Sequence, residues 1–254
     1  MSKVFIEEAT LTGIADAIRD QEGSAEKIPT TQMAERILRL RGSSELQIAK
    51  SFTVHSLNDF GKAKVELELP KASSLANFCY VSEAEYANHT VQELTIRCEQ
   101  KPSSIIGMLY CANTAAADSS LKKLTLLVDT GEATQCQTSF YRLTELEEIV
   151  GTPLDFSSAT ALGGVFTYCD KLREVRFKGT ISNDINLRWG QYSKETFYSL
   201  FAALSAETTG KTLTTRRYLI NQRFESAEGA ADGSSSAEWM ALVDSKPNWT
   251  ISLV

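Results

Sequence analysis

A ten-residue pattern occurs twice in this chain, 26 residues apart. FYRLTELEEI spans 140–149, and FTYCDKLREV spans 166–175. In both copies the first, fourth, seventh and tenth positions are apolar or cysteine. Internal repeats of about 20 to 50 residues are typical of chains in which each repeat buries its apolar face against the next one.

Shorter segments extend this repeat along the chain. The order apolar-x-x-apolar occurs in VQELTIR (91–97), LKKLTLL (121–127), LEEIVG (146–151) and LREVRFK (172–178). Leu94, Leu124, Ile149 and Val175 are 30, 25 and 26 residues apart, and Leu67 precedes Leu94 by 27. Such spacing predicts an α/β solenoid, in which each repeat adds one short strand to a parallel sheet and covers it with a turn or short helix.

Alternate residues of a strand point to the same face of a sheet. The predicted inward side chains are Leu94, Ile96, Leu124, Leu126, Val175 and Phe177. The aromatic and Cys/Leu positions upstream of each strand, such as Phe166 and Cys169, are expected to pack under the sheet on the same positions of the neighbouring repeat. Burial therefore accounts for the repeat, and neither copy holds a residue that must do chemistry.

The outward face of the predicted sheet is the candidate ligand-binding surface, because successive strands place its side chains on a regular grid. Its candidate residues are Thr95, Arg97, Thr125, Leu127, Arg176 and Lys178. One predicted row holds Thr95, Thr125, Val150 and Arg176, and the next holds Arg97, Leu127, Thr152 and Lys178. The alternative locations for a binding site are the loops around Tyr110 and the segment 225–236.

Residues 11–40 predict two short helices joined by a turn. Their apolar stripes are Leu11, Ile14 and Ile18 in the first helix, and Met33, Ile37 and Leu40 in the second. Gly23 and Gly42 follow the helices as stop signals. Isolated helices of about ten residues are marginal in water, so both need a partner, either the rest of the chain or other copies of themselves.

These patterns predict three parts. Residues 1–42 form a helical attachment or oligomerisation module, residues 43–190 form the solenoid, and residues 191–254 form a C-terminal α/β cap. The solenoid includes leading strands around 46–54 and 65–69. In the cap, Ser193 precedes a helical stripe of Phe197, Leu200, Phe201 and Leu204 that is expected to end at Gly210. Further helices are predicted at 218–224 and 237–243, before a final strand WTISLV.

Composition excludes several classes of function. The net charge of −6 argues against nucleic acid as a partner. The longest apolar runs are about one strand long, whereas a bilayer-spanning helix needs about 20 apolar residues, so no membrane insertion is expected. The N-terminus has no apolar region typical of a secretory signal. The five cysteines are odd in number and never form a C-x-x-C pair, which predicts reduced, buried thiols.

The sequence contains no complete catalytic motif, so we expect no enzymatic activity and no catalytic, cofactor or metal site. TGKT at 209–212 resembles the end of a phosphate-binding loop, but Ser205 stands where such a loop requires glycine. His55 and His89 are the two histidines of the chain, which excludes a histidine-rich metal site.

Three stretches resemble known families. LTGIADAIRDQEGSAEKIPTTQMAERILRL (11–40) resembles the N-terminal module of tail and tail-fibre proteins of bacteriophages and prophages of Gram-positive gut bacteria. The pattern F-x-x-C-x-x-L-x-x-V at 166–175 resembles BspA-like leucine-rich repeats, which occur on bacterial surface proteins and phage tail proteins. The C-terminal region, ending in KPNWTISLV, is similar to the closing segment of the same phage tail group.

The resemblance implies a non-enzymatic protein of the virion tail, assembled in the host cytoplasm. We expect it to bind a bacterial surface glycan or protein through the repeats, to contact other tail proteins, and to form homo-oligomers through residues 1–42. Two alternatives stay open: a BspA-like adhesin of a bacterial surface, and a purely structural tail component. A wall-degrading tail hydrolase ranks after both.

Overall fold

The computed structural model describes residues 15, 57–60, 62–69, 72–81, 89–111, 119–224 and 236–254. The chain divides into two compact units, Met1–Gln47 and Ile48–Val254. In the first unit Ala15 is described, and it is helical and buried. The six apolar positions of the predicted attachment helices, the boundary at 42 and 43, and the leading strand around 46–54 lie outside the described residues.

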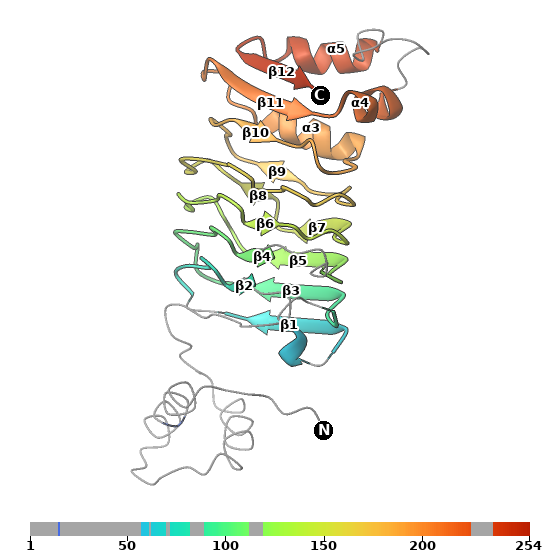
Figure 1. Cartoon of the computed structure of the whole chain (residues 1–254). Helices are drawn as coiled ribbons and strands as arrows, with labels where there is room; N and C mark the ends of the chain where they lie inside the picture. The colour runs from blue at the N-terminus through green and yellow to red at the C-terminus, as the bar shows by residue number, and fades with distance from the viewer. Residues whose placement is uncertain are drawn as a thin grey trace. The chain divides into compact units, whose positions relative to one another are not determined.

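The second unit has a mixed α/β fold with several short parallel sheets and few helices among the described residues (Figure 1). The first strands are β1 (Lys64–Glu68), β2 (Cys79–Val81), β3 (Glu93–Arg97), β4 (Leu109–Cys111), β5 (Lys123–Leu127), β6 (Phe140–Tyr141) and β7 (Glu148–Gly151). They are followed by β8 (Leu154–Asp155), β9 (Phe177–Lys178), β10 (Ile185–Asn186), β11 (Lys211–Thr215) and β12 (Trp249–Leu253). The helices are the 3-10 turn η1 (Leu57–Phe60), α3 (Lys194–Ala203), α4 (Arg217–Arg223) and α5 (Ala237–Asp244).

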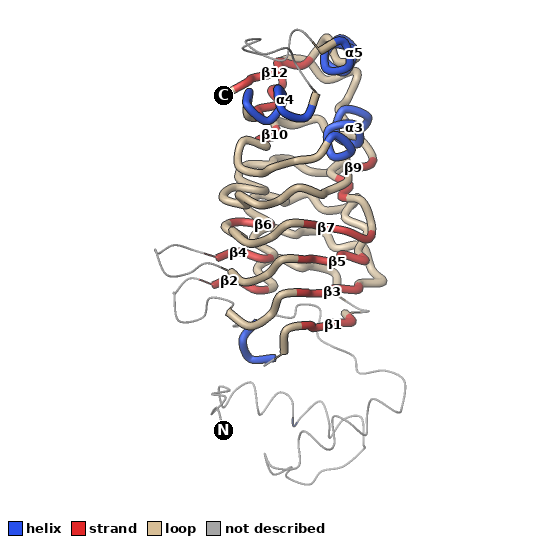
Figure 2. Tube along the Cα trace, turned by 90° about the vertical axis from the view of Figure 1, so that its right-hand side faces the viewer, coloured by secondary structure: helices blue, strands red, loops and turns tan. Residues whose placement is uncertain are grey.

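Between β1 and β7, odd-numbered and even-numbered strands enter different sheets. One sheet has the order β1-β3-β5-β7 and another has the order β2-β4-β6. The strands β8 and β9 form a two-stranded sheet, and β10, β11 and β12 form a separate three-stranded sheet. Figure 2 shows β1, β3, β5 and β7 on one side of the stack, and β2, β4 and β6 on the other. Each passage of the chain between β1 and β7 thus adds one strand to each of two sheets.

The register of the first sheet follows the repeat with one correction. Leu94 lies opposite Leu124, and Leu124 opposite Ile149, as the spacing predicts. The predicted alignment of Leu67 with Leu94 is wrong, because Leu67 lies opposite Ile96 and Val65 lies opposite Leu94. This two-residue shift keeps the same side chains inward, since side chains alternate with a period of two.

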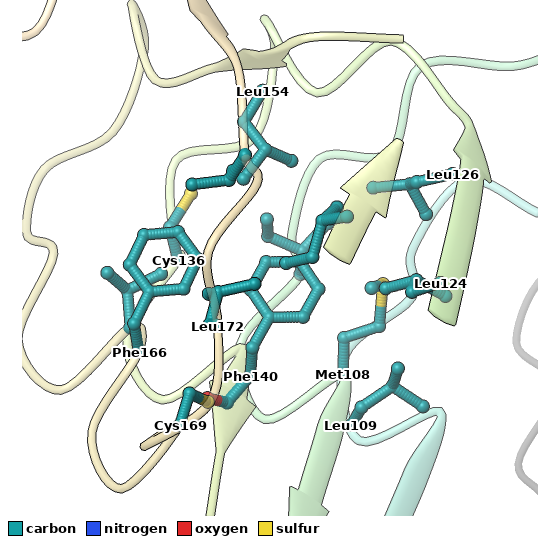
Figure 3. Packing of buried hydrophobic residues seen from close by; sticks show 14 of the residues in the cluster. Met108, Leu109, Leu124, Leu126, Cys136, Phe140, Leu154, Phe166, Cys169 and Leu172 are labelled. Atoms are coloured by element: carbon teal, nitrogen blue, oxygen red, sulfur yellow. The ribbon is translucent and has the colours of Figure 1, made fainter. Parts of the chain in front are cut away.

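The inward positions form the core, as predicted. All eight apolar or cysteine positions of the two ten-residue copies are buried, and so are the six inward strand residues. The rings of Phe140 and Phe166 are stacked with centroids 5.7 Å apart and planes 8° apart. Figure 3 shows these rings side by side in the core, with Leu124 and Leu126 reaching into it from β5. Equivalent residues of successive passages therefore pack on one another.

The prediction of buried, reduced cysteines is confirmed. Cys79, Cys98, Cys111, Cys136 and Cys169 are all buried and free. The Cys169 thiol donates to the backbone oxygen of Phe140 at 3.0 Å. Burial raises the pKa of Cys136 and of Cys169 to about 12, so both stay protonated at neutral pH.

One passage carries three extra residues. Glu148 bridges to Glu174, 26 positions later, whereas Leu154 pairs with Phe177, 23 positions later. The additional residues are 151–153. Gly151 takes a φ of 98°, and a Cβ there would lie 2.6 Å from the backbone oxygen of Leu126. Glycine therefore suits this point on both counts.

The helix α3 stands where another strand would have paired with the last passage. Ser193 caps it as predicted by accepting from the Thr196 N–H. The backbone N–H of Val175 donates to Thr196 Oγ1 at 3.2 Å, and that of Phe177 donates to Ser199 Oγ at 3.3 Å. Side-chain hydroxyls thereby satisfy donors that an open edge would leave exposed.

The end predicted for this helix is wrong. It ends at Ala203 because Leu204 is extended, with a ψ of 130°, and bridges to Ile181. Gly210, the predicted stop, has a φ of 68° and precedes the unpredicted strand β11. The helices predicted at 218–224 and 237–243 and the final strand are confirmed by α4, α5 and β12. None of the helices in the described ranges is both long and apolar enough to span a bilayer.

Candidate binding surfaces

The sheet β1-β3-β5-β7 brings most of the predicted surface residues together. Glu66, Thr95, Thr125 and Val150 are neighbours in register on four successive strands. Arg97 lies beside Leu127 in the same way. Both threonines are half-buried, and Arg97 is exposed. The predicted grid is therefore present over β3 and β5.

Charged side chains on this sheet pair with one another across strands. Lys64, Glu93, Lys123 and Glu148 occupy equivalent positions on β1, β3, β5 and β7. Lys64 Nζ lies 2.8 Å from Glu93 Oε1, and Lys123 Nζ lies 3.1 Å from Glu148 Oε1. Each such surface pair contributes about 0 to 1 kcal/mol to the free energy of unfolding. The main effect of the row is therefore that opposite charges neutralise each other locally.

Lys178 does not join the predicted row. It lies opposite Asp155, and not Thr152, because residues 151–153 shift the pairing at β8 and β9. Its Nζ lies 3.4 Å from Asp129 Oδ1, and Lys101 Nζ lies 3.5 Å from Asp129 Oδ2. A hydrogen bond from the Gly131 N–H lowers the pKa of Asp129, and Lys178 lowers it further. Arg176, the remaining predicted residue, is exposed just before β9.

A row of tyrosines crosses the other sheet. Tyr80 on β2, Tyr110 on β4 and Tyr141 on β6 are neighbours in register. The rings of Tyr80 and Tyr110 lie 4.4 Å apart with planes 4° apart, and those of Tyr110 and Tyr141 lie 4.8 Å apart with planes 16° apart. Parallel strands about 4.8 Å apart place identical side chains at this stacking distance. Tyr80 is 43% exposed, and the other two rings are half-buried.

The row turns at Tyr168. By the repeat offset the equivalent of Tyr141 is Thr167, and Tyr168 follows with a left-handed φ of 59°. Its ring therefore meets Tyr141 edge-on, at 5.7 Å and 89°, and contacts Trp189 at 4.2 Å. We call Tyr80, Tyr110, Tyr141, Tyr168 and Trp189 the aromatic row.

Burial, and secondarily its neighbours Tyr80 and Tyr141, raise the pKa of Tyr110 above its ordinary value. Its phenol therefore stays neutral at physiological pH and can both donate and accept a hydrogen bond. Stacking covers the ring faces within the row, so the row offers ring edges and hydroxyl groups to a partner.

A cleft of about 450 Å³ lies at the end of the aromatic row. It is lined by Arg188, Trp189, Arg216, Tyr218 and Val254. The Arg188 guanidinium lies over the Trp189 ring, 4.8 Å from its centroid. Tyr218, the second residue of α4, is 64% exposed. The cleft thus combines two guanidinium groups with two aromatic rings.

Tyr110 was predicted only as an alternative location, and the other members of the aromatic row were not predicted. The signal was present, because FCYV, MLYC and SFYR each place tyrosine after a buried residue at intervals of 30 and 31. The shorter interval of 27 to Tyr168, in FTYC, hides the fourth member.

Within the described ranges, no group of three or more His, Cys, Asp or Glu side chains is placed to hold a metal ion. The described surfaces offer regular rows of side chains for binding, and a cleft lined by two arginines. No protein-family model, curated protein or solved structure matches this chain. The case for function therefore rests on the two sheet faces and the cleft.

Proposed function

We propose that this chain is a non-enzymatic tail protein of a bacteriophage or prophage, and that it recognises a glycan or protein on the surface of a Gram-positive bacterium. The observation that carries this proposal is the aromatic row. It presents ring edges and hydroxyls at regular intervals from three successive parallel strands. Such a surface suits binding to an extended or repetitive partner.

The support for the aromatic row is a stack that we interpret as a solenoid of BspA-like leucine-rich repeats. Parallel pairs join segments 25 to 30 residues apart, as in Lys64 with Glu93, Glu93 with Lys123 and Lys123 with Glu148. The matched apolar positions are buried throughout. A rigid support lowers the ordering cost of binding, since little conformational freedom remains to be lost.

The aromatic row is favoured over the β1-β3-β5-β7 face as the contact surface. Tyrosine supplies a large amphipathic contact area with few rotatable bonds, and tyrosine and tryptophan are enriched at binding hot spots. On the other face, Lys64, Lys123 and Arg97 already have acidic neighbours within 4 Å. A ligand that binds through those side chains must first break their ion pairs with the neighbouring carboxylates. The threonines and Arg176 remain the secondary location.

Residues 1–42 attach the protein to the tail or to its own copies in this proposal. The motivation is the pair of apolar stripes that two short helices cannot bury on each other. Placing lysine in both stripes, as Ile14→Lys with Ile37→Lys, should lower the mass of the full chain in solution to that of a monomer. An unchanged oligomeric mass, or a monomeric parent protein, removes self-association from the proposal.

The test of recognition is binding of the labelled full chain to a panel of Gram-positive gut bacteria, read by cytometry. We expect saturable, strain-selective binding that an excess of unlabelled protein competes away. Uniform, non-competable binding contradicts recognition. Binding to no strain, together with incorporation into purified tail particles, favours the purely structural tail component.

A further inference from the structure

We propose that the cleft lined by Arg188, Trp189, Arg216 and Tyr218 binds the acidic group of a saccharide, a carboxylate or a phosphate. This inference rests on the proposed recognition function and names the ligand chemistry of its end site. The cleft volume of about 450 Å³ falls within the range of about 300 to 1,000 Å³ found for small-ligand pockets.

The positive charge of the cleft is incompletely neutralised. Among the described residues, Arg188 has no acidic partner, and its guanidinium packs on Trp189. Arg216 Nη2 lies 3.7 Å from Asp170 Oδ1, which is longer than a charge-assisted hydrogen bond of about 2.7 to 2.9 Å. Val254 also lines the cleft, and as the last residue of the sequence it adds a second carboxylate. Among the described residues neither arginine has a carboxylate at the distance of a charge-assisted hydrogen bond, so both guanidiniums can still bind an anion.

The aromatic walls favour a saccharide as the carrier of that anion. A sugar ring has an apolar face and polar edges, and the exposed Tyr218 likewise joins an apolar ring to a hydroxyl group, while Trp189, whose Nε1 is buried, adds apolar surface. Trp189 also contacts Tyr168, which leads to the hydroxyl groups of Tyr141 and Tyr110. A saccharide chain can therefore follow the aromatic row while its acidic group lies between the two arginines.

The walls of the cleft are held in place before any ligand arrives. The Arg188 backbone N–H donates to Asn186 Oδ1 at 3.0 Å. Arg223, on the helix that carries Tyr218, donates to the backbone oxygens of Tyr192 at 3.0 Å and Gln191 at 3.1 Å. These bonds fix α4 to the segment that follows Trp189. A cleft whose backbone is held in this way loses less freedom on binding an anion.

The tryptophans of the chain provide a direct readout. Trp239 and Trp249 are buried, whereas Trp189 is half-buried and lines the cleft. The full chain is titrated, with tryptophan fluorescence recorded, against three probes. These are a hexasaccharide of alternating glucuronate and N-acetylglucosamine, a glycerol phosphate oligomer, and neutral chitohexaose. The two acidic probes distinguish carboxylate from phosphate as the source of the anion.

At least one acidic probe should bind about tenfold or more tighter than chitohexaose and weaken as salt is added. Arg188→Gln and Arg216→Gln should each weaken that probe about tenfold or more, because each removes a charge-assisted contact. Arg188→Lys keeps the positive charge but loses the planar guanidinium. Its affinity for the acidic probe should lie between that of the parent protein and that of Arg188→Gln. Arg173→Gln removes an exposed arginine outside the cleft and should leave affinity unchanged. Melting curves establish that the variants are folded.

Equal affinity for acidic and neutral probes, or an equal response of Arg188→Gln and Arg173→Gln, overturns the inference. Its failure can be told apart from that of the proposed function. If cells are bound in a manner that depends on Tyr110 but not on Arg188 or Arg216, the cleft inference is wrong and recognition stands. If the acidic probe binds through the arginines but no cell is bound, the cleft inference stands and recognition is wrong.

Discussion

The two sheet faces of this molecule use the same parallel geometry in opposite ways. On β1-β3-β5-β7, equivalent positions alternate in charge, as Lys64, Glu93, Lys123 and Glu148. On β2-β4-β6, equivalent positions repeat one residue type, tyrosine. Strands about 4.8 Å apart make identical charges repel and identical rings stack. The charged row is therefore stabilised by alternating signs, and the tyrosine row by repetition of one ring.

The difference teaches which face is free to bind. The alternating charges satisfy one another within the face, so their field largely cancels at a distance. The stacked tyrosines satisfy only their ring faces, and their edges and hydroxyls stay available. Changes confined to one face should therefore separate stability from recognition.

The largest effect is expected where both faces share the core. Phe166→Ala removes a fully buried ring that stacks on Phe140, and it should lower the free energy of unfolding by about 3 to 5 kcal/mol. Urea denaturation measures it. Phe166→Leu keeps much of the volume and should lose less. A loss below about 1 kcal/mol for the alanine variant contradicts the shared core.

A change at Gly151 should damage the charged sheet alone. Gly151→Ala places a Cβ against the backbone oxygen of Leu126 at a φ of 98°. The strain should cost about 1 to 3 kcal/mol of unfolding free energy. Gly163→Ala is the matched control, because a Cβ there meets no atom within 4 Å. Similar melting temperatures for both variants contradict the close approach of Gly151 to the Leu126 backbone.

Charge reversal at Lys123 should sharpen the contrast between the rows. Lys123→Glu places three acidic side chains in succession with Glu93 and Glu148, and should destabilise by up to about 1 kcal/mol at low salt. The double variant Lys123→Glu with Glu148→Lys should recover part of the loss. Thermal melts at low and high salt measure both. A loss that is insensitive to salt and to the second change refutes the electrostatic account.

The smallest effect is expected at Asp129, at the margin of the charged sheet. Its pKa is lowered in the folded state, so its contribution is present above the unfolded pKa of about 3.9 and is lost as pH falls through the folded pKa. Asp129→Asn should therefore cost below about 1 kcal/mol at neutral pH, with the deficit disappearing in acid. Glu132→Gln, which removes another partner of Lys101, is the control. A deficit that persists in acid contradicts this sign.

The apolar period was sufficient to predict the inward residues, because burial requires only that side chains alternate with a period of two. It was insufficient to set the register at β1. Pairing Leu67 with Leu94 or with Ile96 leaves the same faces inward, so the pattern does not distinguish the two. The apolar period could not predict the displacement of Lys178 either. That displacement depends on the backbone conformation of Gly151 and on the additional residues at 151–153.

The binding surfaces were harder to predict than the core. The sequence analysis looked for a site on the long strands, whereas the aromatic row lies mainly on the short strands β2, β4 and β6. Arg188 and Arg216 follow β10 and β11, which pair in parallel with an offset of 28 residues, but neither strand was predicted. This pairing and the packing of α4 against the segment that follows Trp189 together assemble that cleft.

The most direct test of the central claim compares two single variants of the full chain in binding to a strain that the parent protein recognises. Tyr110→Ser removes the middle ring of the aromatic row, and Thr125→Ala changes the middle of the opposite sheet. We predict that Tyr110→Ser weakens binding about tenfold or more while Thr125→Ala leaves it unchanged, with both variants folded by circular dichroism. Loss of binding in Thr125→Ala with Tyr110→Ser unaffected would contradict the account and move the site to the charged face.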